Sequence, residues 1–255
     1  MKLLKYVLSV IIIVLVSCSK KDDNTNSPMV TETFYNGMDL SFQSELEDYN
    51  VPYKDANGNA VELLDFVKSK GTNLIRLKLW HTPQDGQNSL EDVKSYAQRI
   101  KTKEMNFLLD FHYSDFWADP GTQTPPAAWQ NLEIEDLKPA IYNYTKNVVQ
   151  HLKAQNTLPE IIQIGNETDS GFLWDYGKVW NEFNDNWVNY ADLVTEAIRA
   201  VREVDTEGKV KIMLHHSSVE NSIYFFNELQ AYNLDIDIIV ILPSISNQRL
   251  RCGRF

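Results

Sequence analysis

Cysteine is scarce in this sequence, which holds only Cys18 and Cys252 among 255 residues. A framework of disulfides, such as small exported domains use in place of a large core, is therefore excluded. Basic residues are also few, since 24 Lys and Arg stand against 35 Asp and Glu and give a formal net charge of −11. No basic stripe offsets this charge, so we expect no nucleic-acid partner, whereas a neutral polymer is compatible with it.

The sequence also lacks an apolar run long enough to span a bilayer comfortably. The run at residues 6–16 follows two lysines and has the length and composition of a secretion signal. Residues 15–18 (LVSC) resemble the signal box of bacterial lipoproteins. We therefore expect residues 1–17 to be a signal peptide, Cys18 to carry the lipid and residues 18–33 to be a flexible tether. This predicts a bacterial lipoprotein that is exported and anchored to the outer membrane or cell surface; a signal anchor with an incidental cysteine is the alternative.

With 43% apolar and 23% charged residues, the chain suits one globular domain with a sizeable core. From residue 34 onward, apolar runs alternate with amphipathic stretches, which is typical of repeated strand–helix units around a parallel sheet. We predict six strands, at residues 34–40, 73–80, 106–112, 160–165, 210–214 and 235–242. Six such units indicate either a barrel or an open, doubly wound sheet.

Amphipathic helices are predicted between the strands. Their apolar positions recur every three or four residues, at Leu90, Val93, Ala97 and Ile100, at Leu137, Ile141, Tyr144, Val148 and Leu152, and at Trp187, Tyr190, Val194, Ile198 and Val201. Ser89 can cap the first of these helices, with Asp92 at the reciprocal capping position. Gly71 stands just past an earlier helix, where a C-terminal glycine belongs.

The alternation of side chains along the strands separates the two folds. In the second predicted strand Ile75, Leu77 and Leu79 share one face, and Arg76, Lys78 and Trp80 share the other. The third strand likewise places Asp110 and His112 opposite an apolar face. An open sheet with helices on both sides would be apolar on both faces, so the polar face favours a barrel with a chemically equipped interior. The alternative is that Arg76, Asp110 and His112 form a structural cluster inside that barrel.

The fourth predicted strand ends in a carboxylate, because the apolar residues 161–164 are followed by Gly165, Asn166 and Glu167. Side chains at this end of barrel strands face the active site, so Glu167 is a candidate acid. A proton donor needs a raised pKa, which partial burial and a neighbouring carboxylate would supply. Glycosidases normally use two carboxyl groups, so Glu167 alone gives half of such a site.

The loop at residues 112–121 is unusually rich in His, Tyr, Ser, Asp and Trp for a loop that only turns the chain. Sugar binding needs this mixture, because aromatic faces stack on a pyranose while polar groups bond its hydroxyls. The sequence offers four candidate platforms, Trp80, Trp117, Trp129 and Trp174, each of which alone is more often a core residue.

Four segments together carry a resemblance to a known family: residues 37–41 (GMDLS), 76–80 (RLKLW), 110–120 (DFHYSDFWADP) and 163–167 (QIGNE). In order and spacing they resemble the arabinogalactan endo-β-1,4-galactanases, glycoside hydrolase family 53, over roughly residues 34–240. The resemblance implies a (β/α)8 TIM barrel, of which residues 34–242 would supply about six strand–helix units. It also implies retaining, endo-acting hydrolysis of β-1,4-galactan or type I arabinogalactan.

By this resemblance Glu167 is the general acid/base and Asn166 bonds the sugar's 2-hydroxyl. Arg76 and His112 would line the catalytic subsite, and the remaining expected substrate-binding residues are Asp39, Trp80, Ser114, Trp117, Asp119 and Trp174. No cofactor is implied by the parts that match. The calcium site of some family members belongs to a loop later than the segments that match.

The family's nucleophile belongs at the end of a seventh strand, and the resemblance stops before it. After residues 235–239 the sequence departs from the family pattern, and residues 243–255 hold three arginines and no acid. We expect an aberrant tail there, through a frame shift or truncation near Val240, with a natural short variant as the alternative. Neither Asp39 nor Asp237 matches the nucleophile, so little galactanase activity is expected of the sequence as written.

Two other classes of function stay open at this stage. A cell-surface lipoprotein that only binds glycan would keep the Trp-rich loop without the catalytic pair. A metal-dependent hydrolase could use Asp110, His112, Asp115 and either His215 or His216. Neither a His-x-His pair nor His-Glu-x-x-His occurs, and adjacent histidines on a strand would point to opposite faces.

Overall fold

The computed structural model describes residues 34–180 and 186–241. The chain divides into two units, residues 1–34 and 35–255, and the account below concerns the second. The predicted signal peptide, Cys18, the tether and the tail lie outside the described residues. Within the described ranges, no helix is both long and apolar enough to cross a membrane.

Six strands and six helices are found in these ranges. In chain order they are β1 Gly37–Asp39, α1 Gln43–Asp48, α2 Leu63–Ser69, β2 Leu74–Leu79, α3 Leu90–Thr102, β3 Asn106–Phe111, α4 Ile134–Ala154, β4 Ile161–Ile164, α5 Trp187–Val204, β5 Lys211–His216, α6 Ser222–Gln230 and β6 Ile238–Ile241. All six predicted strands are confirmed, although β5 runs two residues further than predicted.

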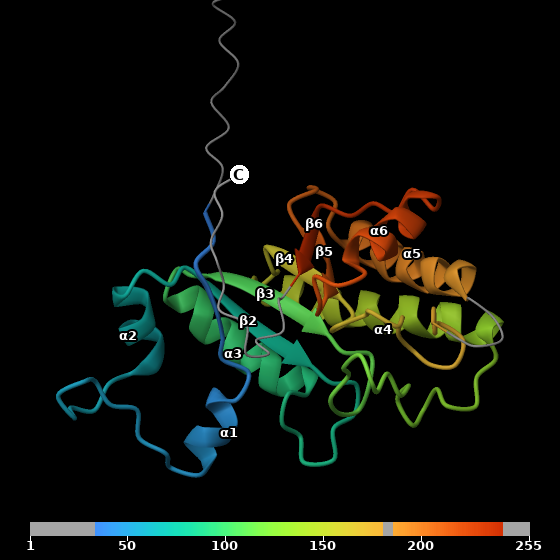
Figure 1. Cartoon of the computed structure of the whole chain (residues 1–255). Coiled ribbons are helices and arrows are strands. Elements are labelled where there is room, and N and C mark those ends of the chain that lie inside the picture. Colours follow the sequence, from blue (N-terminus) through green and yellow to red (C-terminus); the bar gives the residue numbers. More distant parts are fainter. Residues whose placement is uncertain (1–33, 181–185, 242–255) are drawn as a thin grey trace, which may run out of the picture. The chain divides into compact units, whose positions relative to one another are not determined.

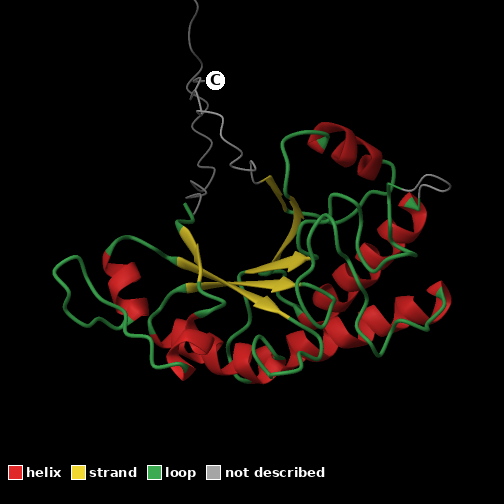
Figure 2. Cartoon of the chain, turned by 60° about the horizontal axis from the view of Figure 1, so that its bottom comes forward, coloured by secondary structure: helices red, strands yellow, loops and turns green. Residues whose placement is uncertain are grey.

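The strands form one parallel sheet in sequence order, β1 to β6. The sheet curls, and the long helices α3, α4 and α5 cover its outer side (Figures 1 and 2). This is the architecture of a partial (β/α)8 barrel, as the sequence predicted, and not of a doubly wound sheet. All C-terminal strand ends lie at the same edge, which is where barrel enzymes place their chemistry.

The two faces of the sheet are filled differently. The outer face packs on the helices through fully buried side chains, including Ile75, Leu79, Phe107, Leu109, Phe111, Ile162, Ile164, Ile212 and Leu214. The inner face carries a smaller apolar cluster of Leu74, Leu108, Ile161 and Met213. Two residues further along each of these strands, the inner face turns polar, with Arg76, Asp110, Gln163 and His215. The predicted polar interior is therefore confirmed.

The helix signals are confirmed with one difference. Ser89 Oγ accepts a hydrogen bond from Asp92 N at 3.3 Å and caps α3 as predicted. The Asp92 carboxylate, however, accepts from Asn88 N at 2.8 Å and not from Ser89 N. The donor of the reciprocal bond is therefore the residue before the cap. Gly71 follows α2 at φ +96°, a conformation that glycine adopts without strain.

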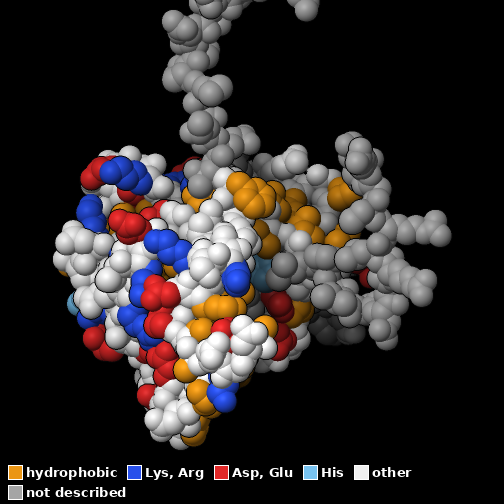
Figure 3. Space-filling model, turned by 90° about the vertical axis from the view of Figure 1, so that its left-hand side faces the viewer, with side chains coloured by type: hydrophobic (Ala, Val, Ile, Leu, Met, Phe, Trp, Pro, Cys, Tyr) orange, Lys and Arg blue, Asp and Glu red, His pale blue; other side chains and the backbone are white. Residues whose placement is uncertain are grey.

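The outer surface mixes charges of both signs. On the face shown in Figure 3, Lys and Arg side chains are interspersed with Asp and Glu. Ion pairs connect α3 and the residue after it to earlier helices, as with Arg99 to Glu47 on α1 at 2.7 Å and Lys103 to Asp65 on α2 at 2.6 Å. Such exposed pairs contribute little stability each, but they break up any continuous basic surface on these helices.

Candidate active site

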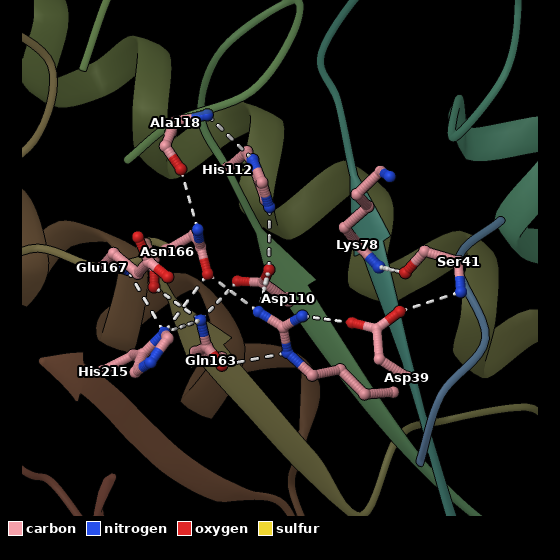
Figure 4. A network of polar contacts seen from close by, with 12 residues as sticks. Asp39, Ser41, Lys78, Asp110, His112, Ala118, Gln163, Asn166, Glu167 and His215 are labelled. Atoms are coloured by element: carbon pink, nitrogen blue, oxygen red, sulfur yellow. Dashed lines mark hydrogen bonds and ion pairs between the residues drawn. The ribbon is translucent and has the colours of Figure 1, made fainter. Parts of the chain in front are cut away.

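Asp110, on the inner face of β3, is the centre of the polar network at the C-terminal strand ends (Figure 4). It is fully buried and accepts hydrogen bonds from Arg76 Nη2 at 2.6 Å and Gln163 Nε2 at 2.6 Å. His112 Nε2 lies 2.9 Å from Asp110 Oδ2, the same oxygen that Arg76 contacts. Burial works to raise the pKa of Asp110, but Arg76 and then His112 outweigh it and hold the pKa below its usual value. Asp110 is thus a buried carboxylate that stays ionised.

Arg76 joins three strands through its guanidinium. Its Nη1 pairs with Asp39 at the end of β1, and its Nη2 also donates to Asn166 Oδ1 at 2.8 Å. Burial works to lower the pKa of Arg76, but Asp110 and Asp39 outweigh this and raise it. The structure therefore brings Asp39, Arg76 and Asn166 together.

Asn166 is fixed by contacts on both atoms of its amide. Its Nδ2 donates to Ala118 O at 2.7 Å, while its Oδ1 accepts from Arg76 and lies 3.2 Å from His215 Nδ1. Ala118 N in turn donates to His112 Nδ1 at 3.1 Å. The loop after β3 and the end of β4 are locked to each other by these bonds.

Glu167 follows β4 in a tight turn. Both Gly165 (φ +81°) and Glu167 (φ +49°) have left-handed backbone conformations. A Cβ on Gly165 would lie 2.4 Å from Thr168 Cγ2, so only glycine fits there. Glu167 N donates to His215 Nδ1 at 3.3 Å, and its carbonyl accepts from Gln123 Nε2 at 3.1 Å. The turn thus fixes the backbone from which the carboxyl group projects.

The carboxyl group of Glu167 differs from that of Asp110. It is half-buried, and among the described residues it has no hydrogen-bond or ion-pair partner. Burial raises its pKa, Asp169 and Asp119 raise it further, and Arg76 opposes them only in part. Glu167 therefore has the raised pKa that a proton donor needs.

The aromatic residues separate into two groups. Trp117 is 45% exposed and packs edge-on against His112, with ring centroids 5.5 Å apart, and against Trp80 at 6.1 Å. Trp129, in contrast, is buried against His81 and Tyr144, so the suggestion that it forms a platform is not supported. Trp174 is half-buried, with Lys178 Nζ 4.0 Å from its ring centroid, so a cation already covers part of that ring.

Ser114 and Asp119 both make hydrogen bonds with backbone N–H groups in or beside the loop after β3. Ser114 is fully buried, and its carbonyl accepts from His81 N at 2.8 Å. Asp119 Oδ1 accepts from Gly121 N at 2.7 Å, which shapes the turn after Trp117. Asp119 also contributes to the raised pKa of Glu167, so its charge acts on the site.

Two residues that the sequence did not assign to the site hold it together. Gln123 Nε2 donates to the carbonyls of Asp119, Asn166 and Glu167 at 3.0, 2.9 and 3.1 Å. His215, considered only as a metal ligand, contacts Asn166, Gln163 and Glu167 through Nδ1. Burial lowers the pKa of His215 to about 4, so its imidazole is neutral. Because Glu167 N donates a hydrogen bond to Nδ1, this ring nitrogen is the acceptor. The place of His215 directly after the strand predicted at residues 210–214 was the available signal.

The metal-site alternative gains no support from this arrangement. In the part of the chain that the structure describes, no group of three or more His, Cys, Asp or Glu side chains is placed to hold a metal ion. Asp115 instead accepts from Thr82 N at 2.9 Å and Ala127 N at 2.8 Å. His216 points away from His215 and lies 3.2 Å from Asp169.

Comparison with known proteins shows which family this chain belongs to. A family model described as Glycosyl hydrolase family 53 matches residues 35–242. The chain belongs to glycosyl hydrolase family 53. The resemblance seen in the four sequence segments is thereby confirmed.

Relatives in family 53 agree in sequence and in structure. A Niallia circulans protein from the bgaB 5′ region is 42% identical over 214 residues, covering 82% of this chain and 58% of its own length. An arabinogalactan endo-β-1,4-galactanase of Thermothelomyces thermophilus is 37% identical over 181 residues, covering 71% and 53%. The family 53 catalytic domain of Ignisphaera aggregans superposes with a TM-score of 0.75 at 36% identity, covering 82% of this chain and 59% of that one. The chain thus spans between half and three-fifths of the length of these relatives.

Proposed function

We propose that this family 53 protein is an endo-acting, retaining glycoside hydrolase that cleaves β-1,4-galactosidic bonds in galactan and type I arabinogalactan. The observation that carries the proposal is the half-buried Glu167 carboxyl, with its raised pKa, beside the ionised Arg76–Asp110 network. Several relatives, including that of Cellvibrio japonicus, bear the name arabinogalactan endo-β-1,4-galactanase.

In the proposed reaction, protonated Glu167 gives its proton to the glycosidic oxygen as the bond to the leaving sugar breaks. A second carboxylate attacks the sugar carbon from the other side, about 5 to 5.5 Å from the acid, and forms a covalent intermediate. Glu167, now ionised, takes a proton from the water that releases the sugar. Arg76 and Asn166 lie next to Glu167 and would bind the sugar in the same subsite.

The nucleophile is expected on a seventh strand, and the described ranges contain six. Two carboxylates in these ranges are poor substitutes. Asp39 is paired with Arg76 and accepts from Ser41 N at 2.9 Å. Asp237, predicted within the sixth strand, instead precedes β6 and accepts from Ile212 N at 2.7 Å and from Arg202. Both are held by structural contacts.

The test compares wild type, Glu167→Gln and the exposed control Glu220→Gln on galactan, each in a chain that includes the seventh strand with the expected nucleophile. In that chain we expect reducing-sugar release by the wild type and the control, and a loss of about 10²- to 10⁴-fold in kcat for Glu167→Gln with binding retained. Turnover that survives in Glu167→Gln would contradict the assignment. Galactan binding without cleavage in all three proteins would favour the alternative, a cell-surface glycan-binding lipoprotein.

We also propose that the protein is exported and anchored to the membrane through a lipid on Cys18, which would bring it to an extracellular polysaccharide. The support is the short apolar run and the LVSC box before and at that residue. In cells fed labelled palmitate, the wild type should take up label and move with the membrane fraction, whereas Cys18→Ala should not. Equal labelling of both proteins would contradict the anchor.

A further inference from the structure

Lys78, on the inner face of β2, is buried without a hydrogen-bond partner for its ammonium. Only 1% of the residue is exposed, and Nζ makes no hydrogen bond within the described ranges. Its backbone N donates to Ser41 Oγ at 2.9 Å, and its side chain lies beside the polar network (Figure 4). Burying a charge without partners is costly, so other groups must stabilise this ammonium.

Three aromatic rings surround the ammonium. Lys78 Nζ lies 3.6 Å from the ring centroid of Phe42, 4.2 Å from that of Trp117 and 4.9 Å from that of Trp80. The face of an aromatic ring attracts a cation within about 6 Å, most strongly when water is excluded. The rings come from three segments, because Phe42 follows β1, Trp80 follows β2 and Trp117 lies in the loop after β3. The contacts of Lys78 therefore tie three loops together.

One of these rings connects Lys78 to the site. Trp117 is 45% exposed, and its ring packs against His112, which contacts Asp110. An exposed ring with a fixed orientation can stack on a sugar, whereas a ring free to rotate loses entropy on binding. The orientation of Trp117 therefore bears on sugar affinity.

We propose that Lys78 is a positioning residue whose ammonium holds the ring of Trp117 in a fixed orientation as a stacking surface for a galactose unit beside Glu167. This inference rests on the proposed galactanase function for its ligand. The contact between Lys78 and Trp117 is independent of that function.

The charge of Lys78 provides a way to vary this contact. Burial lowers the pKa of Lys78 to about 8. Asp39 on β1, Glu45 on α1 and Asp110 on β3 act to raise it, while Arg76 acts to lower it. Lys78 is therefore charged at pH 7 and largely neutral at pH 9. A neutral amine has no cation–π attraction, so the hold on Trp117 weakens as pH rises.

The first experiment needs no substrate. The near-ultraviolet circular dichroism of wild type minus Trp117→Phe isolates the signal of Trp117. Lys78→Met should reduce that signal at pH 7, and Lys78→Arg should retain most of it. The matched control is Lys70→Met, because Lys70 is exposed and lies 5.4 Å from the Phe66 ring on α2, before β2. An unchanged Trp117 signal in Lys78→Met would overturn the proposal, whether or not the protein cleaves galactan.

The second experiment measures galactan cleavage by a chain that includes the seventh strand with the expected nucleophile. Lys78→Met should raise KM for galactan about ten-fold while kcat changes less than about two-fold, and should add little further loss in a Trp117→Ala background. A role confined to folding would lower Tm without this split between KM and kcat, and that result would overturn the proposal.

If Lys78→Met does not fold, the pH dependence of sugar binding by wild type and Trp117→Ala tests the proposal. Its Kd for galactotetraose should rise between pH 7 and 9, whereas the Kd of Trp117→Ala should be flat over that range. A flat wild-type profile would overturn the inference. Absence of galactan turnover by the chain that includes the seventh strand would contradict the proposed function, and the dichroism and Kd results would still test the role of Lys78.

Discussion

The two faces of strands β2 to β5 make an instructive comparison. On the outer face Ile75, Leu109, Ile162 and Leu214 are completely buried against helices. On the inner face of the same strands Arg76, Asp110, Gln163 and His215 bond to one another. Because successive residues point to opposite sides, one short strand supplies a stabilising apolar contact and a chemical group at adjacent positions. Changes on the two faces should therefore have different consequences.

The largest effect on stability is expected from the inner face, at Asp110. Asp110→Asn removes the buried anionic partner of Arg76 and should lower the free energy of unfolding by about 3 to 5 kcal/mol, because Arg76 then keeps only its pair with Asp39. The exposed Asp136→Asn on α4 serves as the control and should be neutral. Chemical denaturation at pH 7 measures both.

The pH dependence sharpens the same prediction. The pKa of Asp110 is lowered in the folded protein, so its contribution is fully present above its unfolded pKa and is lost as pH falls through its folded pKa. The difference in unfolding free energy between wild type and Asp110→Asn should shrink in acid. A difference that is constant with pH would contradict the ionised assignment.

A change on the outer face should affect stability alone. Leu109→Ala, directly before Asp110, should lower the free energy of unfolding by about 3 kcal/mol through lost burial and the cavity left behind. We expect the pH dependence of kcat/KM on galactan to keep its wild-type shape below the melting temperature. A displaced pH profile would show that the two faces are not separable.

A smaller effect, on the pH dependence of kcat/KM, is expected from the charge of Asp169 near Glu167. Asp169 accepts from Ser217 N at 2.8 Å and Oγ at 2.9 Å, and it raises the pKa of Glu167. Asp169→Asn keeps the shape and removes the charge, so the pKa of Glu167 should fall. Because the acid must be protonated, kcat/KM should then decline at lower pH than in wild type. The exposed Asp136→Asn should not move this limb, and an unmoved limb in Asp169→Asn would contradict the role of Asp169.

The sequence predicted the parts of this molecule that depend on local pattern. The six strands, their polar and apolar faces and the cap at Ser89 all follow from spacing along the chain. Arg76, Asp110 and Asn166 were expected at the strand ends, and the structure brings them together. The raised pKa of Glu167 was expected too, from burial and a neighbouring carboxylate.

The remaining features depend on contacts between distant segments. Gln123 binds the carbonyl of Asp119 in its own loop and also those of Asn166 and Glu167, 43 and 44 residues away, and nothing in its own loop indicates the distant contacts. The burial of Trp129 depends on His81 and Tyr144, which belong to separate elements. The ring of aromatic side chains around Lys78 likewise forms only when three loops meet. Pattern along one strand cannot reveal which loop will lie over it.

The central claim is that Glu167 acts as the proton donor on the inner face. The most direct measurement uses a chain that includes the seventh strand with the expected nucleophile. It compares wild type and Glu167→Gln on galactan and on a dinitrophenyl β-galactobioside, whose leaving group needs no proton. We predict a loss of about 10²- to 10⁴-fold in kcat/KM on galactan and a much smaller loss in the rate of dinitrophenol release. Equal losses on both substrates, or no loss on galactan, would contradict the claim.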